Sequence, residues 1–275
     1  MWILSGFADE ISPDLDEQVA LVTELGLKYI ELRSAWDCNV LDLDAAQLRR
    51  VKDTLDAAGI GVSSIGSPIG KISITDDNGA HLDRMRHAAE VARFFGARFI
   101  RMFSYFIPEG DNPDAYRDEV IARLRDLAAI AEDAGVTLIH ENEKEIFGDI
   151  PRRCLDIVES VNSPALKLTW DNANFVQCGV RPFTEGYAML SPHVAYLQVK
   201  DALMADGTVV PAGEGDGEFR QTMRAFAADG FEGFVSLEPH LGYGHSLGGF
   251  SGPENWRRAH RAFTAILDQE GIPYA

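Results

Sequence analysis

The chain alternates short apolar runs with longer amphipathic segments over its whole length. The short runs are rich in β-branched and aromatic residues, which favours strands, whereas the longer segments space their apolar residues as helices do. The predicted strands cover residues 2–7, 29–32, 60–65, 98–103, 136–139, 165–170, 194–199 and 234–237. The predicted helices cover residues 15–25, 45–58, 81–95, 114–134, 151–161, 183–190, 221–228 and 254–269. Strands and helices therefore alternate from one end of the chain to the other.

The ends of several predicted helices carry the residues that helix ends prefer. A glycine follows the helix where the chain is expected to turn into a left-handed conformation. These glycines are Gly26, Gly59, Gly96, Gly135 and Gly230. At the starts, Ser12 before Pro13 predicts a capping serine with proline at the first helical position, and Asp149 before Pro151 predicts a similar start.

The length of the repeating unit predicts a closed barrel of parallel strands. Each strand and its helix span roughly 30 residues, and the series fills a chain of 275 residues, near the roughly 250 residues typical of a (β/α)8 barrel. No linker or low-complexity stretch interrupts the series. We therefore predict an α/β fold, a single (β/α)8 TIM-barrel domain over residues 1–275. The longest irregular stretch, residues 201–218, is expected to be either a lid over the site or a plain surface hairpin.

Polar side chains follow four consecutive predicted strands at the point where each strand ends. Strands five to eight deliver Glu141, Asp171, Gln198 and Glu238, and in a barrel such strand ends face one shared site. Three converging carboxylates cannot all stay ionised without a countercharge, which a divalent cation would supply. Carboxylate and amide oxygens suit Mn2+ or Mg2+ and tolerate Co2+ or Zn2+. The alternative is that these residues form ion pairs at the barrel rim.

Five further residues near strand ends are candidates for substrate binding. Lys200 and Arg33 are placed to hold a substrate oxygen, with structural ion pairs as the alternative. His240, next to the strand-eight carboxylate, is a candidate proton relay or a loop histidine. Glu143 is an auxiliary base only if strand five continues that far. Trp36 offers an apolar wall for the face of a sugar.

The composition narrows the classes of partner. The chain is 46% hydrophobic with a formal net charge of -18, which predicts a folded protein that does not bind nucleic acid, because phosphate contacts need Lys and Arg. No apolar run approaches the roughly 18 residues of a membrane span, so we expect a soluble, cytoplasmic protein. The three widely spaced cysteines are expected to be free thiols. A homo-oligomer is left open.

Two motifs resemble known site signatures and fail on their context. Residues 244–248 match the G-x-S-x-G pattern, but glycines and a proline follow instead of a helix. Residues 66–71 resemble a phosphate loop with the wrong spacing. In the glycine run 213–217, the charges of Glu214 and Asp216 would repel a phosphate. We therefore expect an unphosphorylated substrate.

Four stretches of the sequence resemble the xylose-isomerase-like TIM-barrel superfamily, also called sugar phosphate isomerases/epimerases. The resemblance spans nearly the whole chain, including Asp9-Glu10 and Glu31-Leu32-Arg33. The four stretches are His140-Glu141-Asn142-Glu143, Leu168-Thr169-Trp170-Asp171-Asn172-Ala173-Asn174-Phe175, Gln198-Val199-Lys200-Asp201-Ala202 and Ser236-Leu237-Glu238-Pro239-His240. The resemblance implies one divalent metal ion, Mn2+ being the first candidate, bound by Glu141, Asp171, the strand-seven residue and Glu238. Many members have His on strand seven, whereas this chain has Gln198, as some dehydratase-type members do.

The implied reaction is a proton transfer next to a carbonyl of a small polyhydroxylated substrate. Glu141 and Glu238 would exchange the proton while the metal polarises the carbonyl and stabilises the enediolate, which gives isomerisation or epimerisation. If a neighbouring hydroxyl leaves instead, the same parts give a lyase, a dehydratase of the inosose or 3-dehydroshikimate type. A non-catalytic sugar-binding barrel is a further alternative. A DNA-repair endonuclease of the same fold is disfavoured by the acidic charge and the scarcity of histidine.

Overall fold

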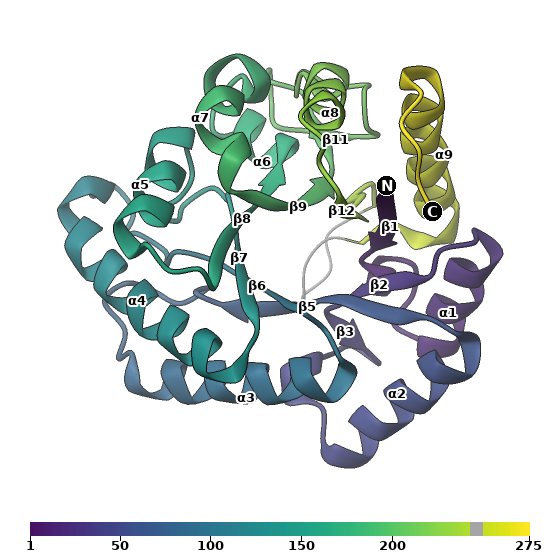
Figure 1. The fold of residues 1–275 in the computed structure, drawn as a ribbon, viewed down its shortest axis with the longest axis horizontal. Coiled ribbons are helices and arrows are strands. Elements are labelled where there is room, and N and C mark those ends of the chain that lie inside the picture. Colours follow the sequence, from purple (N-terminus) through teal and green to yellow (C-terminus); the bar gives the residue numbers. More distant parts are fainter. Residues whose placement is uncertain (243–249) are drawn as a thin grey trace.

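The computed structural model describes residues 1–242 and 250–275, in which eight parallel strands form a barrel (Figure 1). The hydrogen-bonded order is β1-β12-β9-β8-β7-β6-β5-β2, and β1 lies beside β2, so the sheet closes on itself. The strands are β1 (Trp2–Gly6), β2 (Tyr29–Leu32), β5 (Gly61–Ile69), β6 (Phe99–Met102), β7 (Thr137–Glu141), β8 (Leu166–Asp171), β9 (Val194–Val199) and β12 (Gly233–Leu237). The predicted single-domain (β/α)8 barrel is confirmed.

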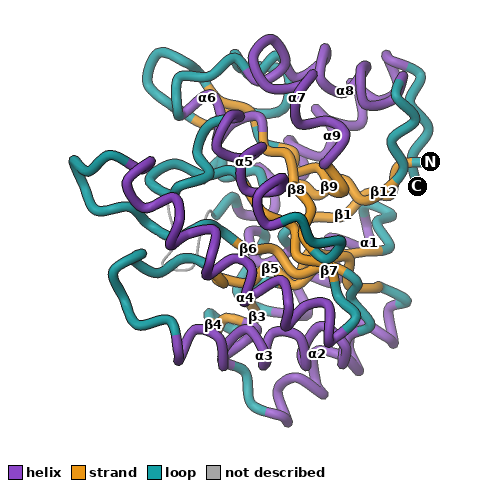
Figure 2. The backbone as a smooth tube through the Cα atoms, turned by 60° about the vertical axis from the view of Figure 1, so that its left-hand side comes forward, coloured by secondary structure: helices purple, strands orange, loops and turns teal. Residues whose placement is uncertain are grey.

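Helices surround the barrel and cover the outer faces of the strands (Figure 2). The α-helices are α1 (Leu15–Glu24), α2 (Ala45–Ala58), α3 (Gly79–Phe95), α4 (Arg117–Ala134), α5 (Pro151–Val161), α6 (Asn172–Gln177), α7 (Ala188–Leu190), α8 (Phe219–Ala228) and α9 (Gly252–Glu270). Shorter helical turns are η1 (Ala8–Glu10), η2 (Val40–Asp42), η3 (Pro113–Tyr116), the π-helical η4 (Pro182–Tyr187) and η5 (Ser191–His193). Two small hairpins pair β3 (Ser34–Ala35) with β4 (Cys38–Asn39) and β10 (Asp201–Ala202) with β11 (Val209–Val210).

The sequence predictions differ from the structure mainly at element ends. Strand β5 runs on to Ile69, so the stretch set aside as a phosphate loop is largely strand. Helix α6 was not predicted; its N-cap is Asp171, whose carboxylate accepts a hydrogen bond from the backbone N–H of Asn174. The segment predicted as one helix over residues 183–190 is a π-helical turn followed by the short α7. The G-x-S-x-G stretch, residues 244–248, lies outside the described residues.

Neither predicted capping residue is an N-cap. The N-cap of α5 is Ile150 rather than Asp149, although Pro151 does begin the helix as predicted. The N-cap of α1 is Asp14, whose carboxylate accepts from the backbone N–H groups of Asp16 and Glu17. Ser12 instead accepts from the backbone N–H of Asp14, so it supports the cap without being it. The five predicted glycines all have positive φ, between 66° and 81°, which confirms the left-handed helix ends that glycine adopts without steric cost.

The segment 201–218, called the Asp201 loop below, forms a hairpin and then wraps around one carboxylate. The side chain of Asp201 accepts hydrogen bonds from the backbone N–H groups of Gly213, Gly215 and Gly217 at 2.9–3.1 Å. A Cβ on Gly215 would lie 2.5 Å from the carbonyl oxygen of Ala202. The alternating glycines therefore serve close backbone approach, and of the two expectations for this segment the structure shows a hairpin.

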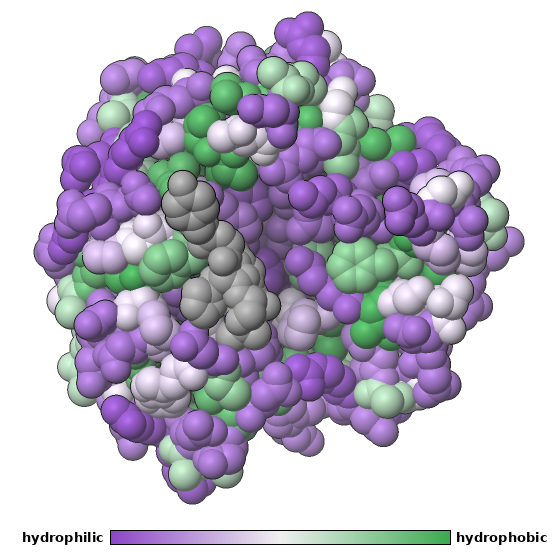
Figure 3. Space-filling view, turned by 180° about the vertical axis from the view of Figure 1, so that it is seen from behind, coloured by the Kyte–Doolittle hydropathy of each residue, from purple (hydrophilic) through white to green (hydrophobic). Residues whose placement is uncertain are grey.

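The carboxyl ends of the barrel strands lie on the face opposite the two chain termini, and this face has a hydrophilic hollow at its centre (Figures 1 and 3). The hydrophobic core includes the aromatic side chains of Trp2 in β1, Trp170 in β8 and Trp256 in α9, each at most 2% exposed. The cysteines are free thiols, as predicted. Within the described part of the chain, no helix is long and apolar enough to cross a membrane.

Candidate metal centre

The structure brings the predicted ligand residues together. Glu141 ends β7, Asp171 ends β8, Gln198 lies in β9, and Glu238 directly follows β12. Their exposed fractions are only 0–2%. One oxygen from each of Glu141, Asp171 and Glu238 lies within 4.8 Å of the other two. We refer to these three residues as the carboxylate cluster.

Two oxygen atoms at the cluster lack hydrogen-bond donors. Gln198 donates its Nε2–H to Glu141 Oε2 at 3.3 Å, whereas its own Oε1 is buried without a hydrogen bond. Asp171 Oδ1 accepts from Asn174, whereas Oδ2 has no hydrogen bond and faces only an ion-pair partner. Buried acceptors without donors are costly. These oxygens, with those of the two glutamates, are the hard donor set of a divalent ion, so the residues fit a metal.

Three buried cations surround the carboxylate cluster. Lys200 Nζ lies 2.8 Å from Glu238 Oε2 and 3.2 Å from Asp171 Oδ2. Arg101 NH1 lies 3.0 Å from Glu141 Oε2 and 3.4 Å from Glu238 Oε1. The third cation, Arg33, reaches Glu238 Oε1 at 3.2 Å. The ion pairs of the alternative interpretation are therefore present, deep in the barrel mouth.

The environments of the acids push their pKa values apart. Burial raises the pKa of Glu141, and it raises the pKa of Asp171 to about 7 despite the nearby Lys200. Burial also opposes the ionisation of Glu238, but the charges of Lys200 and His240 overcome it and hold the pKa of Glu238 well below its usual value. Lys200 stays charged, because Asp171 and Glu238 outweigh burial and raise its pKa well above normal. The surroundings thus shift the pKa values of the two glutamates in opposite directions.

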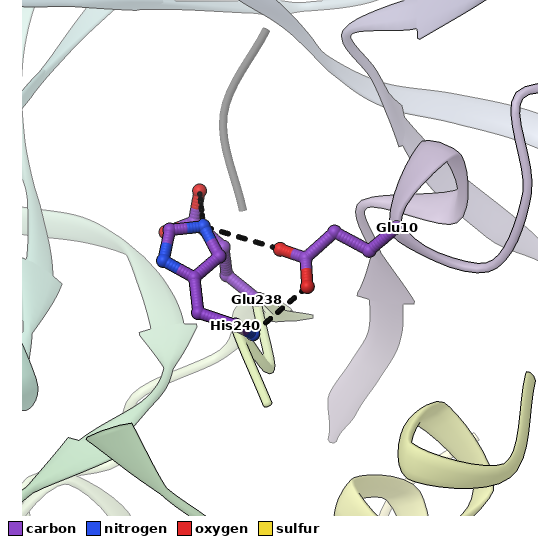
Figure 4. A group of neighbouring side chains, drawn as sticks. All are labelled: Glu10, Glu238 and His240. Atoms are coloured by element: carbon purple, nitrogen blue, oxygen red, sulfur yellow. Dashed lines mark hydrogen bonds and ion pairs between the residues drawn. The ribbon is translucent and has the colours of Figure 1, made fainter. Parts of the chain in front are cut away.

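A second group of possible ligands shares Glu238 (Figure 4). His240 Nε2 lies 3.3 Å from Glu10 Oε1 and 3.4 Å from Glu238 Oε1, and the His240 backbone N–H donates to Glu10 Oε2 at 2.8 Å. Glu10 Oε2 also accepts from the hydroxyl of Ser251. Arg33 lies 3.2 Å from Glu238 Oε1 and 3.8 Å from Glu10 Oε1, so this group also has a cation beside it. The evident role of the group is to hold His240, 26% exposed, beside Glu238.

The remaining predicted site residues lie farther out. Strand β7 ends at Glu141, so the strand argument for Glu143 does not hold; Glu143 pairs with Lys71 at 3.5 Å. The ring of Trp36 lies under the guanidinium of Arg50, 4.8 Å from its centroid. Among the described contacts, neither residue touches the carboxylate cluster.

Sequence reasoning missed several residues of the site. Arg101 and Glu31 lie inside strands β6 and β2 and are at most 5% exposed. Asn174, in α6, donates to Glu141 Oε1 at 3.0 Å. A charged residue inside an apolar strand run was the signal for the first two, because a barrel strand buries such a residue only in its polar interior. Asn174 carried no such signal, since its helix was not predicted.

Comparison with known proteins places the chain in a family. The sequence profile of the xylose isomerase-like TIM barrel family matches residues 19–266. The chain belongs to this family. A curated relative, a probable L-ribulose-5-phosphate 3-epimerase of Mycoplasma pneumoniae, is 23% identical over 219 residues, which cover 76% of this chain and 71% of the relative.

Solved structures of other proteins have the same fold. A xylose isomerase-like TIM barrel protein of Mycobacterium smegmatis, solved in complex with magnesium, superposes with a TM-score of 0.72 at 21% identity, covering 98% of this chain and 97% of its own. The probable 3-DHS dehydratase of Bacillus anthracis involved in petrobactin synthesis has a TM-score of 0.75 at 18% identity, covering 96% and 99%. At these identities the likeness shows the fold alone. Proteins with this fold thus include ones named as an epimerase-like protein and as a probable dehydratase.

Proposed function

We propose that this chain is a divalent-metal-dependent isomerase or epimerase of a sugar or sugar-like polyol. Glu141, Asp171, Gln198 and Glu238 are the proposed ligands, with Mn2+ as the first candidate and Mg2+, Co2+ or Zn2+ also compatible with oxygen donors. The unpaired Oε1 of Gln198 beside three clustered carboxylates is the observation that carries the metal site. When bound, the ion supplies a Lewis acid for the carbonyl oxygen of the substrate.

The proton transfer is assigned to Glu238 and Glu141. Glu238 is the proposed base, because nearby Lys200 and His240 lower its pKa despite its burial, and Glu141, whose pKa burial raises, is the proposed acid. Two carboxyl groups with opposite preferences are what removal of a proton and its return to the other face of a carbon require. Lys200 and Arg33 are proposed to donate hydrogen bonds to substrate oxygens. His240, which is partly exposed beside Glu238, is proposed to relay protons to and from that carboxylate.

The Asp201 loop supports an unphosphorylated substrate. The backbone N–H groups of Gly213, Gly215 and Gly217 donate to Asp201 and are therefore not available to a phosphate. Asp216 and Glu214 add negative charge to the same segment. We therefore propose a neutral polyol or ketose over a sugar phosphate.

A dehydratase is the second candidate function, because it needs the same acids and metal. The observation that favours it is Gln198, which stands on strand seven where many members of the superfamily have a histidine. The two reactions part after removal of the first proton, when the neighbouring hydroxyl either stays or leaves.

Proton exchange in heavy water tests both candidates in one experiment. The Mn2+-loaded protein is incubated with D-fructose, D-tagatose, D-psicose, an inosose or 3-dehydroshikimate, and the products are followed by NMR. An epimerase incorporates deuterium at the carbon next to the carbonyl and yields the epimer, whereas a dehydratase yields an unsaturated product. We expect Glu238→Gln and Glu141→Gln to abolish either reaction, and Glu143→Gln to serve as the matched acid control. Exchange that persists in both variants would contradict the assignment.

A further inference from the structure

Buried cations pair with each acid of the carboxylate cluster at the mouth of the barrel. The carboxylate cluster carries three acids, and Lys200, Arg101 and Arg33 each lie within 3.2 Å of one of them. Arg33 also pairs with Asp9 at 2.7 Å. Unpaired buried charges cost several kcal/mol each, roughly, so this pairing explains how such a cluster coexists with a stable fold.

A divalent ion that binds the cluster must compete with these cations. It would take oxygens of Asp171 and Glu238, the two carboxylates with which Lys200 forms ion pairs. An ammonium and a divalent ion that share the same two carboxylates also repel each other strongly in a buried site. Either the ion binds weakly, or one of the resident cations withdraws from its partners.

The surroundings of the two central cations decide which one withdraws. The guanidinium of Arg101 stacks on the rings of Phe7 and Phe103, at 4.8 and 5.0 Å from their centroids, and is 5% exposed. Its planar head is therefore fixed by packing as well as by charge. Lys200 has no ring contact of this kind among the described residues, and a lysine carries a point charge on a flexible four-carbon stem. The ammonium is thus the cation that can swing away at the lower cost.

We propose that Lys200 is a resident counter-cation of the metal site, which the metal displaces from Asp171 and Glu238 when it binds. The inference rests on the proposed metal centre. Its consequence is an order of events: the ion enters first, and the ammonium that it releases is then available to a substrate oxygen at the same mouth. Without metal, Lys200 stays paired with Asp171 and Glu238.

The affinity for Mn2+ tests the displacement without any substrate. Free Mn2+ is measured by electron paramagnetic resonance during titration of the wild type, of Lys200→Met and of Lys71→Met. Methionine keeps most of the length of the lysine side chain and removes its charge. Lys71 is the matched control, because it is 34% exposed and pairs with Glu143, outside the carboxylate cluster.

We expect Lys200→Met to bind Mn2+ at least about tenfold more tightly than the wild type, because the ion no longer displaces a cation. Lys71→Met should stay within about twofold, since solvent screens its charge. Unchanged or weaker binding by a folded Lys200→Met would overturn the displacement and leave the proposed function standing. A wild type that binds none of Mn2+, Mg2+, Co2+ or Zn2+ would overturn the proposed function, and this inference with it.

A crystal structure of the Mn2+-loaded wild type keeps the inference testable if Lys200→Met does not fold. We expect Lys200 Nζ to lie beyond about 4 Å, the limit of an ion pair, from Asp171 Oδ2. An ammonium that remains at 3.2 Å beside the bound ion would contradict the proposal.

Discussion

The carboxylate cluster and the Asp201 loop both bury acids at the same end of the barrel, but the carboxylates differ in how many of their oxygens accept hydrogen bonds. Asp201 has its charge spread over four backbone N–H groups, those of Ala202, Gly213, Gly215 and Gly217. Asp171, 30 residues earlier in the chain, has one oxygen without a hydrogen bond, and the amide oxygen of Gln198 next to it is also unpaired. A satisfied buried carboxylate organises the backbone around it, whereas unsatisfied oxygens that converge indicate a site kept for a ligand.

The largest expected contrast is in metal binding. Asp171→Asn keeps the size of the side chain and an oxygen that can cap α6, but it removes one charge from the ligand set. We expect the affinity for Mn2+ to fall by about 100-fold or more, because charged oxygen donors dominate the binding of hard ions. Asp201→Asn should leave the affinity within a few-fold of wild type. The comparison fails if isothermal titration finds equal losses in the two variants.

The next contrast is in stability, where we expect the larger effect at Asp201 rather than in the carboxylate cluster. Asp201→Ala leaves buried backbone N–H groups without an acceptor, so we expect a loss of about 2–4 kcal/mol in the free energy of unfolding. Gly217→Ala should act similarly, because its Cβ would lie 2.6 Å from Asp201 Oδ1. Urea denaturation measures both variants. The matched control is Asp206→Ala in the exposed turn of the same hairpin, where the aspartate accepts from the backbone N–H of Thr208.

The smallest effect is expected from a buried residue outside both regions. His81 accepts the backbone N–H of Gly70 at 2.8 Å through Nε2, and burial lowers its pKa to about 4. The unfolded chain takes up a proton at this histidine near pH 6.5 and the folded protein only near pH 4, so stability is complete above pH 6.5 and falls as the pH drops between these values. After allowance for solvent screening, the loss should be about 1–2 kcal/mol.

The variant His81→Gln separates this contribution from the rest of the acid sensitivity. Glutamine keeps an acceptor for the N–H of Gly70 but does not titrate. Thermal melts between pH 6.5 and 4 should therefore decline less steeply for the variant than for the wild type. Parallel declines would show that His81 does not titrate as its burial implies.

The periodicity of the sequence was enough to predict the fold. Eight apolar runs, the helix-ending glycines and the unit length gave a barrel with boundaries correct to within a few residues. The misassigned start of α1 shows the limit of local rules, because Ser12 and Asp14 are both good caps and only the structure shows which one faces the helix. Helix α6 was missed because its six residues directly follow a strand.

The site residues at strand ends could be predicted from the sequence, whereas those inside strands could not. Glu141, Asp171 and Glu238 come at or after the end of an apolar run, where the sequence marks the end of a strand. Arg101 and Glu31 lie within such runs, and the direction of a side chain inside a short strand depends on the tilt of the barrel. The ion pairs at the barrel mouth could not be predicted either, because Arg101 pairs with both Glu141 and Glu238.

The metal content of the purified protein tests the central claim most directly. Mass spectrometry would compare the wild type with Glu141→Gln and Glu238→Gln, each after incubation with Mn2+ and removal of free ion. The account predicts close to one divalent ion per wild-type chain and almost none in either variant. A wild type that retains no Mn2+, Mg2+, Co2+ or Zn2+ would contradict it, and the cluster would then be a network of structural ion pairs.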